Sequence, residues 1–111
     1  MNKKVIIFLT YILLIIALSF SDTSKVNYFF PIWKYDKIFH FFEYLILGIL
    51  SASAIRSIDD KNFIIITTIF IILFPFLDET IQYFIPTRVY DIKDIFVDIV
   101  GAQVGLSLYV E

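Results

Sequence analysis

Apolar residues are gathered into four stretches, which cover about residues 5–20, 36–55, 62–85 and 92–110. A helix needs roughly 20 residues to cross the hydrocarbon core of a bilayer, and the four stretches are close to that length. Polar and apolar positions do not alternate, and the backbone in lipid is satisfied only within helices or closed barrels. The pattern therefore predicts an all-α, polytopic membrane protein: a bundle of four transmembrane helices in a single domain, residues 1–111.

The first stretch has an alternative interpretation as a cleaved signal peptide. It follows Lys3 and Lys4, is short, and ends among the small residues Ala17, Ser19 and Ser21. Cleavage would leave three transmembrane helices. We favour a retained first helix, and in both cases the segment after it lies on the far side of the membrane.

Basic residues bear on the orientation of the predicted bundle. Four Lys or Arg residues flank one side and five flank the other, so the positive-inside count does not decide. Lys3 and Lys4 lead directly into the first helix, which usually dominates the orientation. This places both termini in the cytoplasm.

Composition narrows the possible functions. Apolar residues make up 59% of the chain, charged residues make up 18%, and the net charge is −2. We therefore expect no nucleic-acid partner, because the chain has no basic excess. There are no cysteines, which excludes disulfides and thiolate chemistry. With one histidine we expect no metal or other cofactor; a cation held by His40, Glu43 and Glu79 is a minor alternative.

Ionisable side chains lie near the ends of three predicted helices that should meet at one membrane face. Because the helices alternate in direction, the start of the second, the end of the third and the start of the fourth share this face. Spacings of three and four residues keep each set on one side of its helix. The candidate binding residues are Asp36, Lys37, His40, Glu43, Tyr44, Glu79, Gln82, Arg88, Asp94 and Asp98, and Asp78 and Asp91 lie beside them in the sequence.

Three of these carboxylates should reach a similar depth. Glu43, Glu79 and Asp98 each lie six or seven residues from the membrane end of their helix, which is on the order of 10 Å at the helical rise. A charge near mid-membrane costs at least about 2.5 kcal/mol on insertion scales, so these groups should face inward and be paired. Lys37 and Arg88 are the candidate counter-ions.

Small residues predict where two helices approach each other. Gly101 and Gly105 continue the face of the fourth helix that carries Asp94 and Asp98. Small residues four apart let membrane helices pack closely, and such a contact would draw Asp98 toward its neighbours. An ion-pair network that only joins helix ends is the alternative to a functional site.

Three blocks of sequence carry the candidate residues: DKIFHFFEYLILG at 36–48, DETIQYFIPTR at 78–88 and DIKDIFVDIVGAQVG at 91–105. Together they resemble the VanZ-like family of membrane proteins. The matching residues are Asp36, Lys37, His40, Tyr44, Gly48, Glu79, Gln82, Pro86, Arg88, Asp94, Gly101 and Gly105. The three glycines are assigned to helix packing. Asp98 departs from the pattern, since the family usually has Asn there, and the extra charge must be neutralised by a proton or a cation.

The resemblance implies a role at the bacterial cell envelope, because the family's founding member is linked to low-level resistance to teicoplanin. The implied location is the bacterial cell membrane, and the orientation inferred from Lys3 and Lys4 places the polar face outward. The leading hypothesis is a non-enzymatic protein whose outward polar pocket binds a lipid-linked headgroup or a lipoglycopeptide.

Two other hypotheses stay open. One is an intramembrane hydrolase or phosphoryl-group enzyme, in which His40, Glu79 and Asp98 are the catalytic candidates and Arg88 is the anion clamp. The other is a proton-coupled carrier that uses buried carboxylates as a relay, although no inverted repeat supports it.

Overall fold

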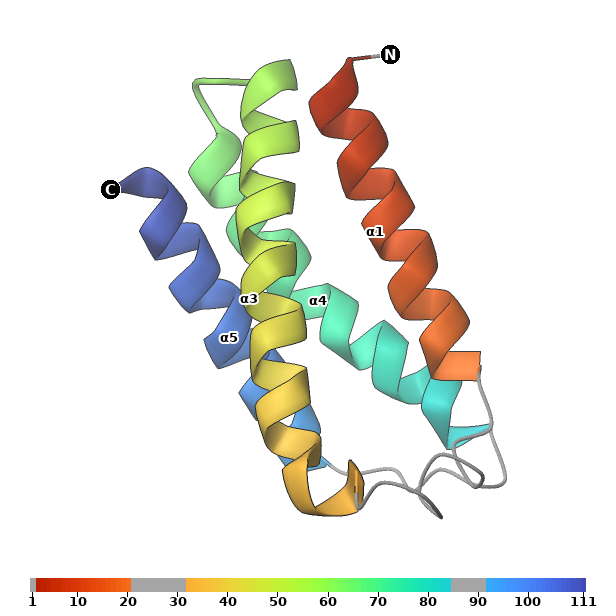
Figure 1. The fold of residues 1–111 in the computed structure, drawn as a ribbon. Helices are drawn as coiled ribbons and strands as arrows, with labels where there is room; N and C mark the ends of the chain where they lie inside the picture. The colour runs from red at the N-terminus through yellow and green to blue at the C-terminus, as the bar shows by residue number, and fades with distance from the viewer. Residues whose placement is uncertain (1, 21–31, 85–91) are drawn as a thin grey trace.

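Four helices make up most of the described chain, which in this computed structural model comprises residues 2–20, 32–84 and 92–111 (Figure 1). They are α1 (Lys3–Phe20), α3 (Ile32–Ile58), α4 (Phe63–Tyr83) and α5 (Ile92–Val110). Side chains are described in these ranges except for those of residues 32–36. The described residues include no strand, so the prediction of an all-α protein is confirmed.

The helices alternate in direction, so the two chain ends lie toward the same end of the bundle (Figure 1). The end of α1, the start of α3, the end of α4 and the start of α5 lie at the opposite end. The helices α3 and α4 contact each other, and each of them also contacts α1 and α5. Each of the four helices therefore reaches the end of the bundle where the candidate residues lie.

The observed helices are not limited to the apolar stretches. The pattern places the second helix at residues 36–55, whereas α3 extends over Ile32–Ile58. The third helix ends at Tyr83 rather than at residue 85. An apolar run marks the part of a helix that suits lipid, while backbone hydrogen bonding continues into more polar residues at either end. The fourth helix has the predicted bounds.

Three helices are long and apolar enough to cross a membrane: α1, α3 from Lys37 to Ile58, and α4. The fourth, α5, is not among them, and its 19 residues include Lys93, Asp94 and Asp98. The prediction of membrane-spanning helices is therefore supported for three helices by length and composition. Spanning by α5 stays a prediction.

The outer faces of the helices are apolar. Leu13 is 67% exposed on α1, and Ile65 and Leu73 are 65% and 62% exposed on α4. Large contiguous apolar patches are unusual on soluble monomers, whereas lipid tails solvate them without penalty. The side chains facing outward thus suit a bilayer.

Glycines allow α3 and α5 to approach closely. A Cβ atom added at any of the three glycines would come closer than 3.0 Å to a backbone carbonyl oxygen of the facing helix. The oxygens belong to Ala102 opposite Gly48, Phe41 opposite Gly101 and Leu45 opposite Gly105. Since backbone atoms cannot turn aside as a side chain can, α3 and α5 keep this separation only while these positions lack a Cβ.

Gly105→Ala should lower the stability of the bundle by about 1–3 kcal/mol, the usual range for an atom forced into a packed contact. Helix propensity alone predicts the opposite sign, because alanine is favoured over glycine inside a helix by about 1 kcal/mol. Thermal unfolding in detergent decides between the two. The control is Gln103→Ala at an exposed position of α5, which should leave Tm close to wild type. A Tm for Gly105→Ala at or above wild type would contradict the packing argument.

Candidate functional site

Buried polar residues from all four helices gather at the end of the bundle where α3 and α5 begin. We call them the polar cluster: Ser19 of α1, His40 and Tyr44 of α3, Asp78, Glu79 and Gln82 of α4, and Asp94 and Asp98 of α5. None of these residues exposes more than 6% of its surface. A buried polar group is costly unless it is hydrogen-bonded or paired, so the contacts between these side chains determine what the cluster can do.

Two polar contacts join the start of α3 to the start of α5. Lys37 pairs with Asp94, and His40 Nδ1 lies 2.8 Å from Asp98 Oδ1. His40 Nε2 lies 4.0 Å from Asp94 Oδ2, which is beyond direct hydrogen-bond range. The Lys37 side chain is 42% exposed and that of Asp98 is 0% exposed. The Lys37–Asp94 contact therefore lies near the surface of the bundle, and the His40–Asp98 contact lies in its interior.

Asp78 links three helices through its carboxylate. The Tyr44 hydroxyl of α3 donates a hydrogen bond of 2.7 Å to Asp78 Oδ2. The Ser19 hydroxyl of α1 donates to Asp78 Oδ1. Both oxygens of this buried carboxylate on α4 are thus satisfied, and α1 is held against the polar cluster.

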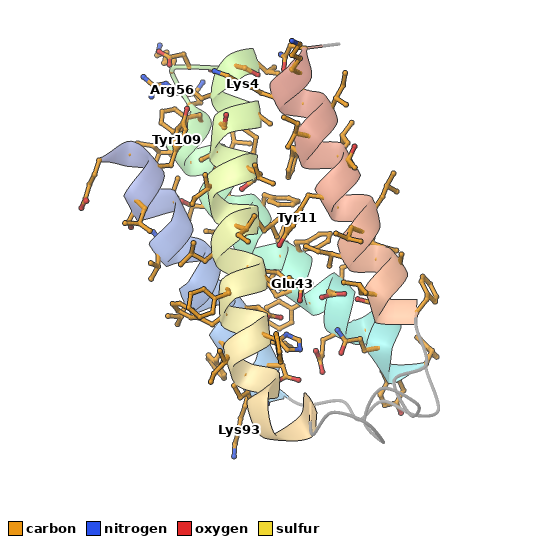
Figure 2. All side chains as sticks on the ribbon, in the orientation of Figure 1. Lys4, Tyr11, Glu43, Arg56, Lys93 and Tyr109 are labelled. Atoms are coloured by element: carbon orange, nitrogen blue, oxygen red, sulfur yellow. The ribbon has the colours of Figure 1, made fainter. Side chains whose placement is uncertain are left out.

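Glu43 lies where α1 crosses α3. Figure 2 shows Tyr11 of α1 directed toward α3 near Glu43, and the Tyr11 hydroxyl donates to the Glu43 backbone oxygen at 2.7 Å. The Glu43 side chain is half-buried and, like Asp78 and His40, lies within electrostatic range of Asp98. Carboxyl groups of α3, α4 and α5 are therefore within electrostatic reach of one another.

The structure places six of the ten candidate binding residues in the polar cluster, and a seventh, Lys37, contacts it. Direct contacts join Lys37 to Asp94, His40 to Asp98, and Tyr44 to Asp78. Glu79 and Gln82 are buried on the same part of α4.

The other three candidates are Glu43, which is outside the polar cluster, and Asp36 and Arg88, whose side chains are not described. Glu43 is only half-buried, as described above. The side chain of Asp36 and the whole of Arg88 lie outside the described residues. The predicted clamp by Arg88 therefore stays a prediction.

Sequence reasoning missed Ser19 and left Asp78 outside the candidate set. In the sequence, Ser19 fits a signal-peptide cleavage site, because small residues follow the hydrophobic part of a signal peptide. A second signal was present in the spacing: Tyr11, Ile15 and Ser19 are four residues apart and occupy one side of the helix. Two polar residues in such a stripe on an apolar helix indicate the side that faces the bundle.

Metal binding has no geometric support in the described chain. Among the described residues, no group of three or more His, Asp or Glu side chains is placed to hold a metal ion together. The minor alternative of a cation held by His40, Glu43 and Glu79 therefore does not match the observed geometry.

Ser19→Ala and Tyr44→Phe should each lower the stability of the bundle by about 1–3 kcal/mol, because each leaves one oxygen of the buried Asp78 without its donor. The double variant should deviate from additivity, since both donors share one carboxylate. Thermal unfolding of the purified proteins measures these effects. The matched control is Thr10→Val, whose hydroxyl is exposed and donates to the Ile6 carbonyl of its own helix. Losses no larger than that of the control would show that Asp78 does not depend on these hydroxyls.

Comparison with known proteins identifies the family. The profile of the VanZ/LLP1 family matches residues 3–110, a range that contains all four helices and every residue of the polar cluster. No curated protein and no solved structure matches the chain significantly. The three blocks that resemble the VanZ-like family thus form part of a match that covers essentially the whole sequence, and the chain belongs to the VanZ/LLP1 family.

Proposed function

We propose that this single-domain protein spans the bacterial cell membrane with four helices and binds an envelope ligand at the polar cluster. The observation that carries the proposal is the burial of polar side chains from all four helices at one end of a largely apolar bundle. Ionisable groups at membrane depth are expensive and are by default functional. Membership of the VanZ/LLP1 family supports a role at the envelope.

The chemistry of the cluster favours a ligand that offers hydrogen-bond donors. Carboxyl groups of Asp78, Glu79, Asp94 and Asp98 lie in the cluster, and Glu43 is beside it. Such groups accept hydrogen bonds from amides, amines and hydroxyls. A lipoglycopeptide of the teicoplanin type is rich in these donors. A lipid-linked anionic headgroup would depend instead on Lys37 and on Arg88, whose guanidinium can hold an anion bidentately.

A purely structural network is the competing explanation, and near-isosteric variants separate the two. Glu79→Gln removes a charge, His40→Asn removes the titratable ring, and Arg88→Lys removes the bidentate fork. If the polar cluster binds a ligand, each variant should insert and unfold like wild type but abolish any change in teicoplanin susceptibility of an expressing host. If the cluster is only structural, each buried pair that loses one partner should cost about 3–5 kcal/mol, and activity should fall with the amount of folded protein.

The measurement is paired: folded protein by size-exclusion chromatography and susceptibility on the same cultures. Glu111→Gln is the matched control, since it removes an exposed carboxylate at the C-terminus. The binding proposal is wrong if susceptibility changes only in proportion to folded protein across the set.

An intramembrane hydrolase or phosphoryl-group enzyme is the second candidate, and the contact between His40 and Asp98 favours it. A carboxylate 2.8 Å from a ring nitrogen can orient a histidine that acts as acid or base. In this candidate, Glu79 would assist and Arg88 would clamp the anion. Phosphate release from a lipid phosphate by the purified protein, lost in His40→Asn, would replace the binding proposal with this one.

The proposed orientation places the polar cluster toward the outside and both termini in the cytoplasm. Lys93 extends away from the bundle at the polar end, and Arg56 lies at the other end close to Asp59 in sequence (Figure 2). The chain has no cysteine, so Lys93→Cys and Asp59→Cys each introduce a single label site. In intact cells a membrane-impermeant maleimide should label Lys93→Cys and spare Asp59→Cys, while permeabilised cells should label both. The reverse pattern would invert the orientation.

A further inference from the structure

Asp98 has an unusual environment within the polar cluster. It is 0% exposed, and its Oδ1 lies 2.8 Å from His40 Nδ1. Its Oδ2 is buried and has no hydrogen-bond partner among the described residues. Burying an ionised carboxylate costs free energy when one of its oxygens has no hydrogen-bond donor. Protonation of that oxygen would neutralise the group and remove this cost.

The surrounding groups add to this effect. Both helices packed against α5 contribute titratable side chains to this end of the bundle: Lys37, His40, Glu43 and Tyr44 from α3, and Asp78 and Glu79 from α4, beside Asp94 of α5 itself. The Lys37 ammonium pairs with Asp94. Like charges close together in a low-dielectric interior cannot all stay ionised.

The contacts also provide a path to the surface. Side-chain exposure falls from 42% at Lys37 to 6% at Asp94, 7% at His40 and 0% at Asp98. His40 lies between the two acids, with Nδ1 2.8 Å from Asp98 Oδ1 and Nε2 4.0 Å from Asp94 Oδ2. The longer gap can be crossed by a small side-chain rotation or by one bridging water.

From this arrangement we propose that Asp98 is a proton-binding site inside the bundle, filled and emptied through His40 from the membrane face where α3 and α5 begin. The site does not depend on the binding of an envelope ligand, so either proposal can fail alone.

The transfer conserves one proton. His40 begins neutral, with its hydrogen on Nδ1 and a lone pair on Nε2. A proton arriving past Lys37 and Asp94 binds Nε2, and the Nδ1 hydrogen then passes to the Asp98 carboxylate. His40 is left neutral with its hydrogen on Nε2, and Asp98 is left as a carboxylic acid. The reverse steps release the proton to the same face.

Infrared difference spectroscopy of the protein in liposomes tests the site directly. Between high and low pH, wild type should gain the C=O band of a protonated carboxylic acid, and Asp98→Asn should lose part of that band. Glu111→Gln, which removes an exposed carboxyl group, should keep the buried-acid band. After transfer into D₂O the band should shift several-fold more slowly in His40→Asn than in wild type.

Two results would overturn the proposal in this experiment. An unchanged band in Asp98→Asn would show that Asp98 holds no proton. Equal exchange rates in His40→Asn and wild type would show that the proton does not pass through His40.

Labelling of wild type gives a second test that needs no folded variant. Dicyclohexylcarbodiimide enters membranes and modifies protonated carboxyl groups, and mass spectrometry locates the product. Modification should fall on Asp98, decrease as pH rises, and be unaffected by sodium ions at constant pH. Modification of Asp78 or Glu79 in place of Asp98 would contradict the assignment. Protection by sodium would make this a cation site instead.

Discussion

The close parallel approach of α3 and α5 is the constraint on which the rest of the site depends. Gly101 and Gly105 lie against the backbone of Phe41 and Leu45, so equal steps along the two helices keep the same partners in register. Toward the start of both helices, this close approach brings Lys37 to Asp94 and His40 to Asp98. If α5 spans the membrane as predicted, burying apolar surface against α3 adds little stability, and van der Waals contact at small residues and polar contacts hold the pair together.

Charged side chains are exposed at one end of the bundle and buried at the other. At the end with the chain termini, Arg56 Nε lies 2.7 Å from Asp60 Oδ1, but their side chains are 49% and 76% exposed. Exposed pairs of this kind contribute about 0–1 kcal/mol, and the groups would be solvated without them. At the other end the acids of the polar cluster are buried, so each requires a proton, a hydrogen-bond donor or a counter-ion within the protein. The exposed charges at the first end are those expected where a helix meets water. The buried acids at the second end need another explanation.

Much of the fold was predictable because lipid imposes simple rules on the backbone. The helices and their alternation follow from apolar length, and the shared face of three helix ends follows from that alternation. The contribution of α1 could not be read in the same way, since a serine near the end of an apolar run fits a cleavage site as well as an interior hydrogen bond. The pairing of His40 with Asp98 was not predictable either, because it depends on which residues of α3 and α5 face each other. The glycines indicate that the two helices pack closely but do not specify these pairs.

The acid at position 98 changes what the cluster can do. An asparagine, which the resemblance to the family would place there, could hydrogen-bond His40 but would have the same charge at every pH. A carboxyl group in the same place can be neutral or ionised, and its state alters the field at His40 and at Tyr44, which donates to Asp78. Asp78 also accepts from Ser19, so a change at Asp98 on α5 can reach α1 through two side chains of α3 and α4. A ligand held by these donors and acceptors would therefore experience the protonation state of Asp98 even without touching it.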